Sequence, residues 1–425
     1  MIGYTGKGIT MKRSIPWRAF FLLVLLAISV QGCLSTSDNS NQNFKQVNTS
    51  NGQTLQVNTS DQALFKGKIY FTQDHVLLLI DGSRNVHTLT PRNQDVRDPA
   101  VSPDGKRIAF IVRYKYSSDL VYMPAQGGPV RILASGTGHF FQNNNDFTQD
   151  NYIWYSQPAW SENSSTLIFL SDLQKYYDWA NYPYGDLGGD FDQSLFLDMQ
   201  VFSVPLNNPP PRSVIENSGI VAYANFGDGG DRDPGYRPHH PYEVIYTHYT
   251  YDSSRSNQVI QLFMEDPTMI VKHPEKHYHP GDPGGGYDPG IAITPPNVQN
   301  LQPAFSPTGN SIAYIRRIDP THMGLYVMPV PENITGDPNN KDVEQKALQP
   351  YKQSSLIVQG QFVSQPVWSP DGKQIAYLSY NNNTFDIWLA NVSADAKTGA
   401  YKMQGNPVQL TSGGVDGDSR PFWAP

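Results

Sequence analysis

The sequence predicts an all-β fold in which four-stranded sheets form the blades of a six-bladed β-propeller. Two observations carry this prediction: a hairpin motif recurs along the chain, and the N-terminal part can complete its last, partial copy. The composition agrees, since 12% of the residues are aromatic, only 16% are charged, and 35 glycines and 34 prolines provide for many turns.

The clearest copy of the motif is "QPVWSPDGKQIAYLS", which begins at Gln365. Pro370 has the φ angle that the second position of a type I turn requires, and Gly372 can take the positive φ that closes such a hairpin with a bulge. The residues that follow alternate between polar and apolar, as in a half-buried strand. A single hairpin of this kind would be marginal alone, so its recurrence is the informative feature.

Related stretches occur at four other places, and a partial copy, "SRPFWAP", stands at the end of the sequence. They are "DPAVSPDGKRIAFIV" from Asp98, "QPAWSENSSTLIFLS" from Gln157, "DPGYRPHHPYEVIYTHY" from Asp233 and "QPAFSPTGNSIAYIR" from Gln302. We call the proline near the start of each copy its register proline: Pro99, Pro158, Pro234, Pro303, Pro366 and Pro421. The spacing of these prolines accommodates four short strands with their loops, which is the unit of a propeller.

The two ends of the propeller region complement each other. Residues 420–423 would supply only the innermost strand of a blade, whereas "KGKIYFTQDHVLLLIDGSRNVHTLT", from Lys66, has three strand-like runs without such a partner. Joining the C-terminal strand to the N-terminal blade closes the ring and protects the edges that an open array would expose.

The repeated copies resemble the Pro-Asp-Gly repeat of the TolB-like six-bladed propellers. A similar repeat forms the propeller of some serine peptidases and of oligogalacturonate lyases. The resemblance covers residues 67–425 and implies a fold rather than an activity, because propellers support many functions. TolB carries an additional N-terminal α/β domain, which we do not expect before Gly67.

The N-terminal segment predicts export and membrane anchoring. In "MKRSIPWRAFFLLVLLAISVQGC", basic residues precede an apolar run over residues 19–30, the length of a secretory signal core. Cys33, the only cysteine, follows this run, and the segment resembles a bacterial lipoprotein lipobox, whose cysteine is diacylated. We therefore expect a signal peptide over 1–32 and a protein lipid-anchored at Cys33 on the extracytoplasmic face of the bacterial envelope. A plain signal peptide or an uncleaved anchor are the alternatives.

The polar stretch that follows predicts a flexible tether over 33–62, which leaves 63–425 for the propeller. The formal net charge is −7, which argues against nucleic acid or anionic lipid as the main partner. The membrane would be reached through the lipid anchor alone.

Two glycine-rich segments carry clustered aspartates, which can present oxygen ligands to a hard cation such as calcium. The first contains Asp186, Asp190 and Asp192, and the second contains Asp228, Asp231 and Asp233. Aspartate and glycine are also the commonest turn residues, so an ordinary turn is the competing interpretation.

A third segment, "KHPEKHYHPGDPGGGYDPG", brings His273, His277 and His279 close to Asp282 in the sequence. Neighbouring imidazoles can bind a transition metal, and oligogalacturonate lyases use histidine ligands on a similar propeller. These histidines do not align with that family's motif residue by residue, so no role is carried over. A solvated loop is the alternative.

Five aromatic residues crowd one insertion and suggest a ligand-binding surface, since aromatic rings beside acidic groups can stack on sugars. They are Tyr176, Tyr177, Trp179, Tyr182 and Tyr184. Packing of the insertion against the propeller rim would explain them equally well.

The sequence lacks the short signatures of nucleophilic, metalloprotease and phosphate-binding enzymes. We therefore expect a binding or scaffold module for a protein, peptide or glycan, without a cofactor and without catalytic residues. The alternative is a metal-dependent, lyase-like enzyme that acts on polysaccharide.

Overall fold

The computed structural model describes residues 44–49, 54–141, 148–173, 199–206, 221–222, 230–252, 254, 256–265, 290–332 and 340–425. All of them belong to one compact unit, Asn43–Pro425. Most of the regular structure in these ranges consists of strands. The helix α3 (Lys341–Leu348) is preceded by its N-cap residue, Asn340, whose side chain accepts a hydrogen bond from the backbone N–H of Asp342. No helix in the described part of the chain is long and apolar enough to cross a membrane.

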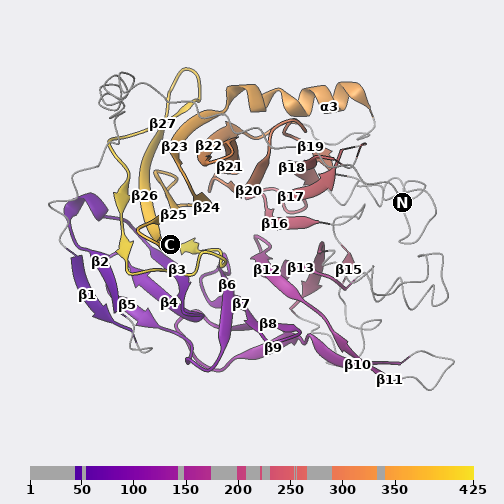
Figure 1. The fold of residues 1–425 in the computed structure, drawn as a ribbon, viewed down its shortest axis with the longest axis vertical. Coiled ribbons are helices and arrows are strands. Elements are labelled where there is room, and N and C mark those ends of the chain that lie inside the picture. Colours follow the sequence, from indigo (N-terminus) through magenta and orange to yellow (C-terminus); the bar gives the residue numbers. More distant parts are fainter. Residues whose placement is uncertain are drawn as a thin grey trace, which may run out of the picture. The chain divides into compact units, whose positions relative to one another are not determined.

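Most strands form antiparallel sheets in which neighbours in the sequence pair with each other (Figure 1). One sheet comprises β6 (Asp95–Val101), β7 (Arg107–Arg113), β8 (Ser118–Pro124) and β9 (Arg131–Ala134). The next comprises β12 (Tyr155–Trp160), β13 (Thr166–Ser171), β14 (Gln200–Pro205) and β15 (Val221–Ala222). It is followed by β16 (Asp231–Tyr236), β17 (Val244–Tyr251), β18 (Gln258–Glu265) and β19 (Ile291–Ala292).

Two further sheets continue this order. The first comprises β20 (Asn300–Phe305), β21 (Ser311–Asp319), β22 (His322–Pro329) and β23 (Ser355–Gly360). The second comprises β24 (Val363–Trp368), β25 (Gln374–Asn381), β26 (Thr384–Ala394), β27 (Tyr401–Met403) and β28 (Val408–Gln409).

The remaining sheets draw on distant parts of the chain or project from it. One combines β30 (Phe422–Ala424) with β3 (Lys68–Gln73), β4 (Val76–Asp81) and β5 (Val86–Thr88). Another combines β1 (Phe44–Asn48) and β2 (Thr54–Asn58) with β29 (Thr411–Ser412). A two-stranded hairpin consists of β10 (Thr137–Phe141) and β11 (Thr148–Tyr152).

The repeated motif folds into the turn that its residues predict. In the copy at Ser369, the backbone N–H of Gly372 donates to Ser369 O over 2.9 Å, and Gly372 has a φ of 68°. The copies at Gly105 and Gly309 have the same hydrogen bond and a φ of 69°. Glycine suits this position because a Cβ disfavours the left-handed region.

We call the strand that contains or directly follows a register proline the inner strand of its sheet: β6, β12, β16, β20, β24 and β30. Each inner strand contacts the next, and β30 contacts β6, so the series closes around a common axis (Figure 1). Aromatic residues near the ends of these strands join adjacent sheets. The indole of Trp160 on β12 donates to Ala100 O on β6 over 2.8 Å, and that of Trp368 on β24 donates to Ala304 O on β20 over 3.1 Å.

The C-terminal strand pairs with the N-terminal sheet, as the incomplete last copy predicts. Ile69 of β3 is the register partner of Trp423 in β30, and the Trp423 indole donates to Lys66 O over 2.7 Å. Trp423 also packs edge-to-face on Phe65, with ring centroids 5.7 Å apart.

The expected number of blades is wrong. The described residues form seven sheets of three to five strands rather than six, because β1, β2 and β29 make an additional three-stranded sheet. Leu55 and Val57 of β2 are fully buried in the same apolar cluster as Leu389 and Leu410. The expected tether range 33–62 thus contains a paired hairpin, and its burial explains why these residues fold onto the propeller.

Candidate functional site

The residue that precedes five of the six register prolines occupies an unusual backbone conformation, and Arg420, before Pro421, does not share it. Asp98, Gln157, Asp233, Gln302 and Gln365 have φ values between 48° and 55°, although none is glycine. The strand register shifts at each of these positions. Such strain persists only where other contacts compensate for it, and at all of these positions except Gln365 the side chain makes a hydrogen bond.

Side chains at these positions link neighbouring inner strands. Asp98 Oδ2 accepts from the backbone N–H of Gln157 over 3.1 Å. The Gln157 amide pairs with Asp233 in both directions: Oε1 accepts from Asp233 N over 2.6 Å, and Nε2 donates to Asp233 Oδ1 over 3.0 Å. We call this series of side chains around the axis the belt.

The belt continues through a hydroxyl and a second amide. The Thr247 hydroxyl donates to Asp233 Oδ2 over 3.1 Å and accepts from Gln302 N over 3.0 Å. Gln302 Oε1 then accepts from the backbone N–H of Gln365 over 2.8 Å. Each inner strand from β6 to β24 is therefore joined to the next by a polar side chain.

Arg420, which precedes the last register proline, joins β30 to the belt at Asp98 and crosses the axis. Its backbone N–H donates to Asp98 Oδ1 over 2.9 Å. Its guanidinium donates to Pro158 O over 3.0 Å and to Pro234 O over 3.2 Å. Pro234 lies on β16, the inner strand farthest from β30 in the closed series, so the side chain spans the ring.

The carboxyl groups beside Arg420 lie in a poorly hydrated environment. Asp98 and Asp233 are buried, and burial raises the pKa of both above the ordinary value, while the nearby Arg420 charge opposes the shift. Burial, reinforced by the Asp233 charge, also raises the pKa of Tyr249 to about 12.

A cavity of about 610 Å³ lies between the inner strands, and its lining includes four of the residues that precede register prolines: Arg420, Asp233, Gln302 and Gln365. We call these four residues the floor of the axial cavity. The walls carry most of the register prolines and six aromatic side chains: Trp160, Tyr236, Phe305, Trp368, Phe422 and Trp423. At the rim, His239 Nδ1 lies 2.9 Å from Glu162 Oε1, and both side chains are largely exposed. The volume and lining are those of a ligand site with few polar groups.

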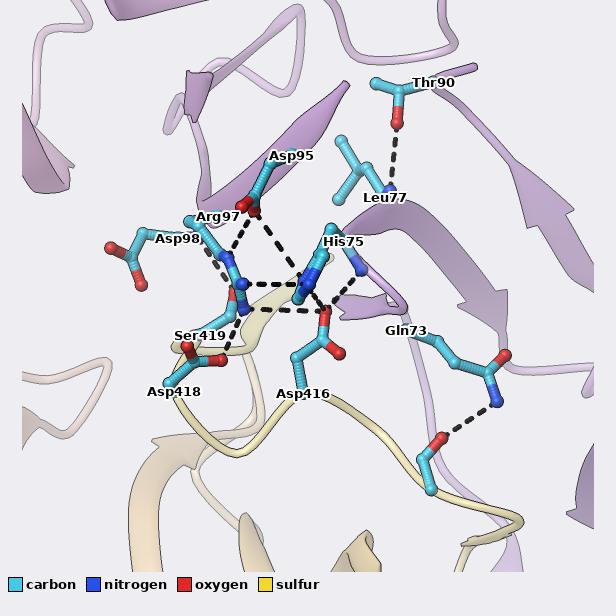
Figure 2. A network of polar contacts seen from close by, with 11 residues as sticks. Gln73, His75, Leu77, Thr90, Asp95, Arg97, Asp98, Asp416, Asp418 and Ser419 are labelled. Carbon is cyan, nitrogen blue, oxygen red and sulfur yellow. Dashed lines mark hydrogen bonds and ion pairs between the residues drawn. The ribbon is translucent and has the colours of Figure 1, made fainter. Parts of the chain in front are cut away.

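A second polar cluster lies at the start of the inner strands, away from the cavity. Figure 2 shows Arg97 between Asp95 and Asp418, with His75 and Asp416 beside them. Arg97 Nε donates to Asp95 Oδ1 over 2.7 Å, Nη1 pairs with Asp418, and the backbone N–H of His75 donates to Asp416 Oδ2 over 2.8 Å. These contacts fasten the segment before β30 to β6 and to the β3–β4 turn, so we assign this cluster to closure of the ring.

Two of the aspartates predicted as metal ligands are occupied by other partners. Asp231 Oδ1 lies 2.9 Å from His248 Nδ1, and Asp233 is a member of the belt. Among the described residues, no group of three or more histidine, cysteine, aspartate or glutamate side chains could hold a metal ion.

The other predicted site residues lie outside the described part of the chain, so those predictions stay predictions. They are Cys33, Asp186, Asp190, Asp192, Asp228, His273, His277, His279, Asp282, Tyr176, Tyr177, Trp179, Tyr182 and Tyr184. Arg420, Gln302 and Gln365 carry no local sequence motif that would mark them as functional residues. The signal was their common place immediately before a register proline.

Comparison with protein-family models finds no match, and comparison with curated proteins finds none. Among solved structures, TolB from Acinetobacter baumannii has a TM-score of 0.51 and 14% sequence identity, over 84% of this chain and 67% of the TolB chain. An oligogalacturonate lyase in complex with manganese gives a TM-score of 0.40 and 11% identity, over 85% of this chain and 83% of the lyase chain. The first similarity supports a TolB-like β-propeller fold and the second carries no functional argument.

Proposed function

We propose that this chain is a binding module which accepts a protein loop or peptide segment in its axial cavity. The observation that carries the proposal is the axial cavity itself, whose lining consists mainly of aromatic, proline and other apolar side chains with a few polar ones among them. Flat aromatic and proline surfaces accommodate apolar side chains and extended peptide backbones at low entropic cost.

The distribution of polar groups favours a peptide over a glycan. A sugar presents hydroxyl groups around its whole ring, and each one that is buried without a hydrogen bond costs free energy. The walls are formed mainly by apolar groups such as those of Trp160, Phe305 and Trp368, so they would leave such hydroxyls unpaired. A peptide can place its apolar side chains on these walls and its polar groups at the floor.

Gly235 offers a direct way to fill the cavity. It lines the axial cavity, and a Cβ built on it would meet within 4 Å only Ile245 Cγ2, at 3.8 Å. We expect Gly235→Trp to occupy the cavity and abolish ligand capture, whereas Gly235→Ala leaves it open. The measurement is a pull-down from envelope extracts with the purified full-length protein, comparing both variants with the wild type. Equal recovery of the same partner with Gly235→Trp would refute the proposed site.

We further propose that the module is held at the bacterial envelope by acylation of Cys33, after removal of residues 1–32. The lipobox-like sequence supports this proposal, and two acyl chains suffice for stable anchoring. Replacing Cys33 with serine should move the protein from the membrane fraction to the soluble fraction. Unchanged fractionation would remove the lipoprotein hypothesis and leave the cavity proposal intact.

A further inference from the structure

The belt has spare hydrogen-bonding groups on one side of the axis. Gln157 uses both ends of its amide, whereas Gln302 uses only Oε1, and its Nε2 has no partner among the described residues. The Gln365 side chain makes no hydrogen bond in the described structure, and its Oε1 is fully buried. Gln365 is only 7% exposed. Because its Oε1 is fully buried, the atom of this amide that is left to bind a ligand in the cavity is the Nε2 donor.

These spare groups belong to the lining of the same cavity as Arg420. Gln302, Gln365 and Arg420 all line the axial cavity. The Arg420 guanidinium has five N–H groups. In the described structure, one donates to Pro158 O and another to Pro234 O. Amide and guanidinium donors therefore gather at the floor, where an acceptor group on a ligand would meet them.

The charges at the floor decide which acceptor fits. Two buried carboxylates, Asp98 and Asp233, lie beside the single Arg420 charge, so that positive charge is already balanced. A ligand carboxylate would add a further negative charge in a region of low polarity, which is unfavourable. An uncharged carbonyl oxygen accepts the same hydrogen bonds without that cost.

We propose that the floor recognises a neutral amide carbonyl of the inserted segment, from the main chain or from an asparagine or glutamine side chain, and that Gln365 is its specificity-determining residue. This inference rests on the proposed function and names the chemistry of its ligand. Gln365 is suited to the role because its side chain holds no other part of the fold, in contrast to Gln157 and Gln302.

A library of random 12-residue peptides displayed on phage serves as the probe. Selection on the wild-type full-length protein, with counter-selection on Gly235→Trp, isolates peptides that require the cavity. Calorimetry then compares wild type, Gln365→Leu and the control Gln359→Leu, which alters an exposed glutamine on β23. We expect Gln365→Leu to weaken binding roughly fivefold to tenfold, the effect of losing one hydrogen bond, without lowering the melting temperature. The control should bind like the wild type.

The outcomes separate the two proposals. If no peptide distinguishes the wild type from Gly235→Trp, the proposed function fails and this inference fails with it. If such peptides bind Gln365→Leu as tightly as the wild type, the role of Gln365 is refuted and the cavity remains a binding site. If the peptides depend on an aspartate or glutamate whose change to asparagine or glutamine abolishes binding, the neutral-carbonyl assignment is overturned.

Discussion

At the scale of single residues, the position before each register proline connects the fold with the candidate site. At five of these positions the backbone is left-handed, and at all of those except Gln365 the polar side chain makes a hydrogen bond to a neighbouring strand. Where the hydrogen bond uses only part of the amide, as in Gln302, the remainder is available to a ligand. A repeated structural position thus provides recognition groups without extra loops.

Asp386 gives a residue-scale prediction of pH dependence. It accepts hydrogen bonds from Gly414 N and from the Thr411 and Thr384 hydroxyls, and burial raises its pKa to about 6. The Asp386 carboxyl therefore binds its proton more tightly in the folded state than in the unfolded state. As a result, the contribution of Asp386 to the free energy of unfolding falls as pH rises from about 4 to about 6.

Replacing Asp386 with asparagine removes this pH-dependent contribution to the free energy of unfolding, while the amide oxygen can still accept hydrogen bonds from the hydroxyls. We expect the free energy of unfolding of the variant, relative to the wild type, to increase by about 2 kcal/mol between pH 4 and pH 7. Urea unfolding at several pH values measures this difference. A constant difference across that range would contradict the raised pKa.

At the scale of elements, one hairpin turn recurs in different surroundings. Gly105 and Gly309 occupy the same turn position with the same φ of 69°. A Cβ on Gly105 would meet nothing within 4 Å, whereas one on Gly309 would lie 2.5 Å from Pro238 O of the neighbouring sheet.

We expect Gly105→Ala to cost about 1 kcal/mol of unfolding free energy, from backbone strain alone. Gly309→Ala should cost about 2 kcal/mol or more, since a backbone atom must also move. Thermal or urea denaturation of the two variants tests this. Equal costs would mean that the turn at Gly309 does not pack closely on the sheet of β16.

The sequence predicts the repeated elements well because their chemistry is local. Turn residues such as Pro370 and Gly372 specify a hairpin without reference to the rest of the chain. The additional sheet escaped prediction because β1, β2 and β29 contain no copy of the motif, and polar residues such as Gln46 and Asn58 suggested a tether. Long-range pairing, not local pattern, makes them strands.

The candidate site could not be predicted from local sequence patterns either. The residues before the register prolines differ in type, so Asp98, Gln157 and Arg420 share no motif until the ring brings them together. The aspartates chosen for metal binding illustrate the converse. Asp233 looked like a free ligand in a glycine-rich loop, yet the fold uses it to join β16 to its neighbours.

At the scale of the whole molecule, stability depends on joining residues that are far apart in the sequence. Trp423 is 6% exposed, packs on Phe65 and pairs with Ile69, so it stabilises the closing sheet. We expect Trp423→Ala to lower the free energy of unfolding by about 3 to 5 kcal/mol, in one cooperative transition.

The control is His87→Ala, an exposed substitution on β5 of the same sheet, which should change stability by less than about 0.5 kcal/mol. Calorimetry of both variants provides the measurement. Two separate unfolding transitions in Trp423→Ala would show that the sheets unfold independently and that pairing of β30 with β3 does not stabilise the whole propeller.

The course of Arg420 across the axis gives three inner strands one common contact. Its backbone N–H bonds to Asp98 on β6, and its guanidinium bonds to the carbonyls of Pro158 on β12 and Pro234 on β16. Because no pair of neighbouring strands holds this side chain by itself, shortening it would loosen several sheets at once rather than a single seam between two of them.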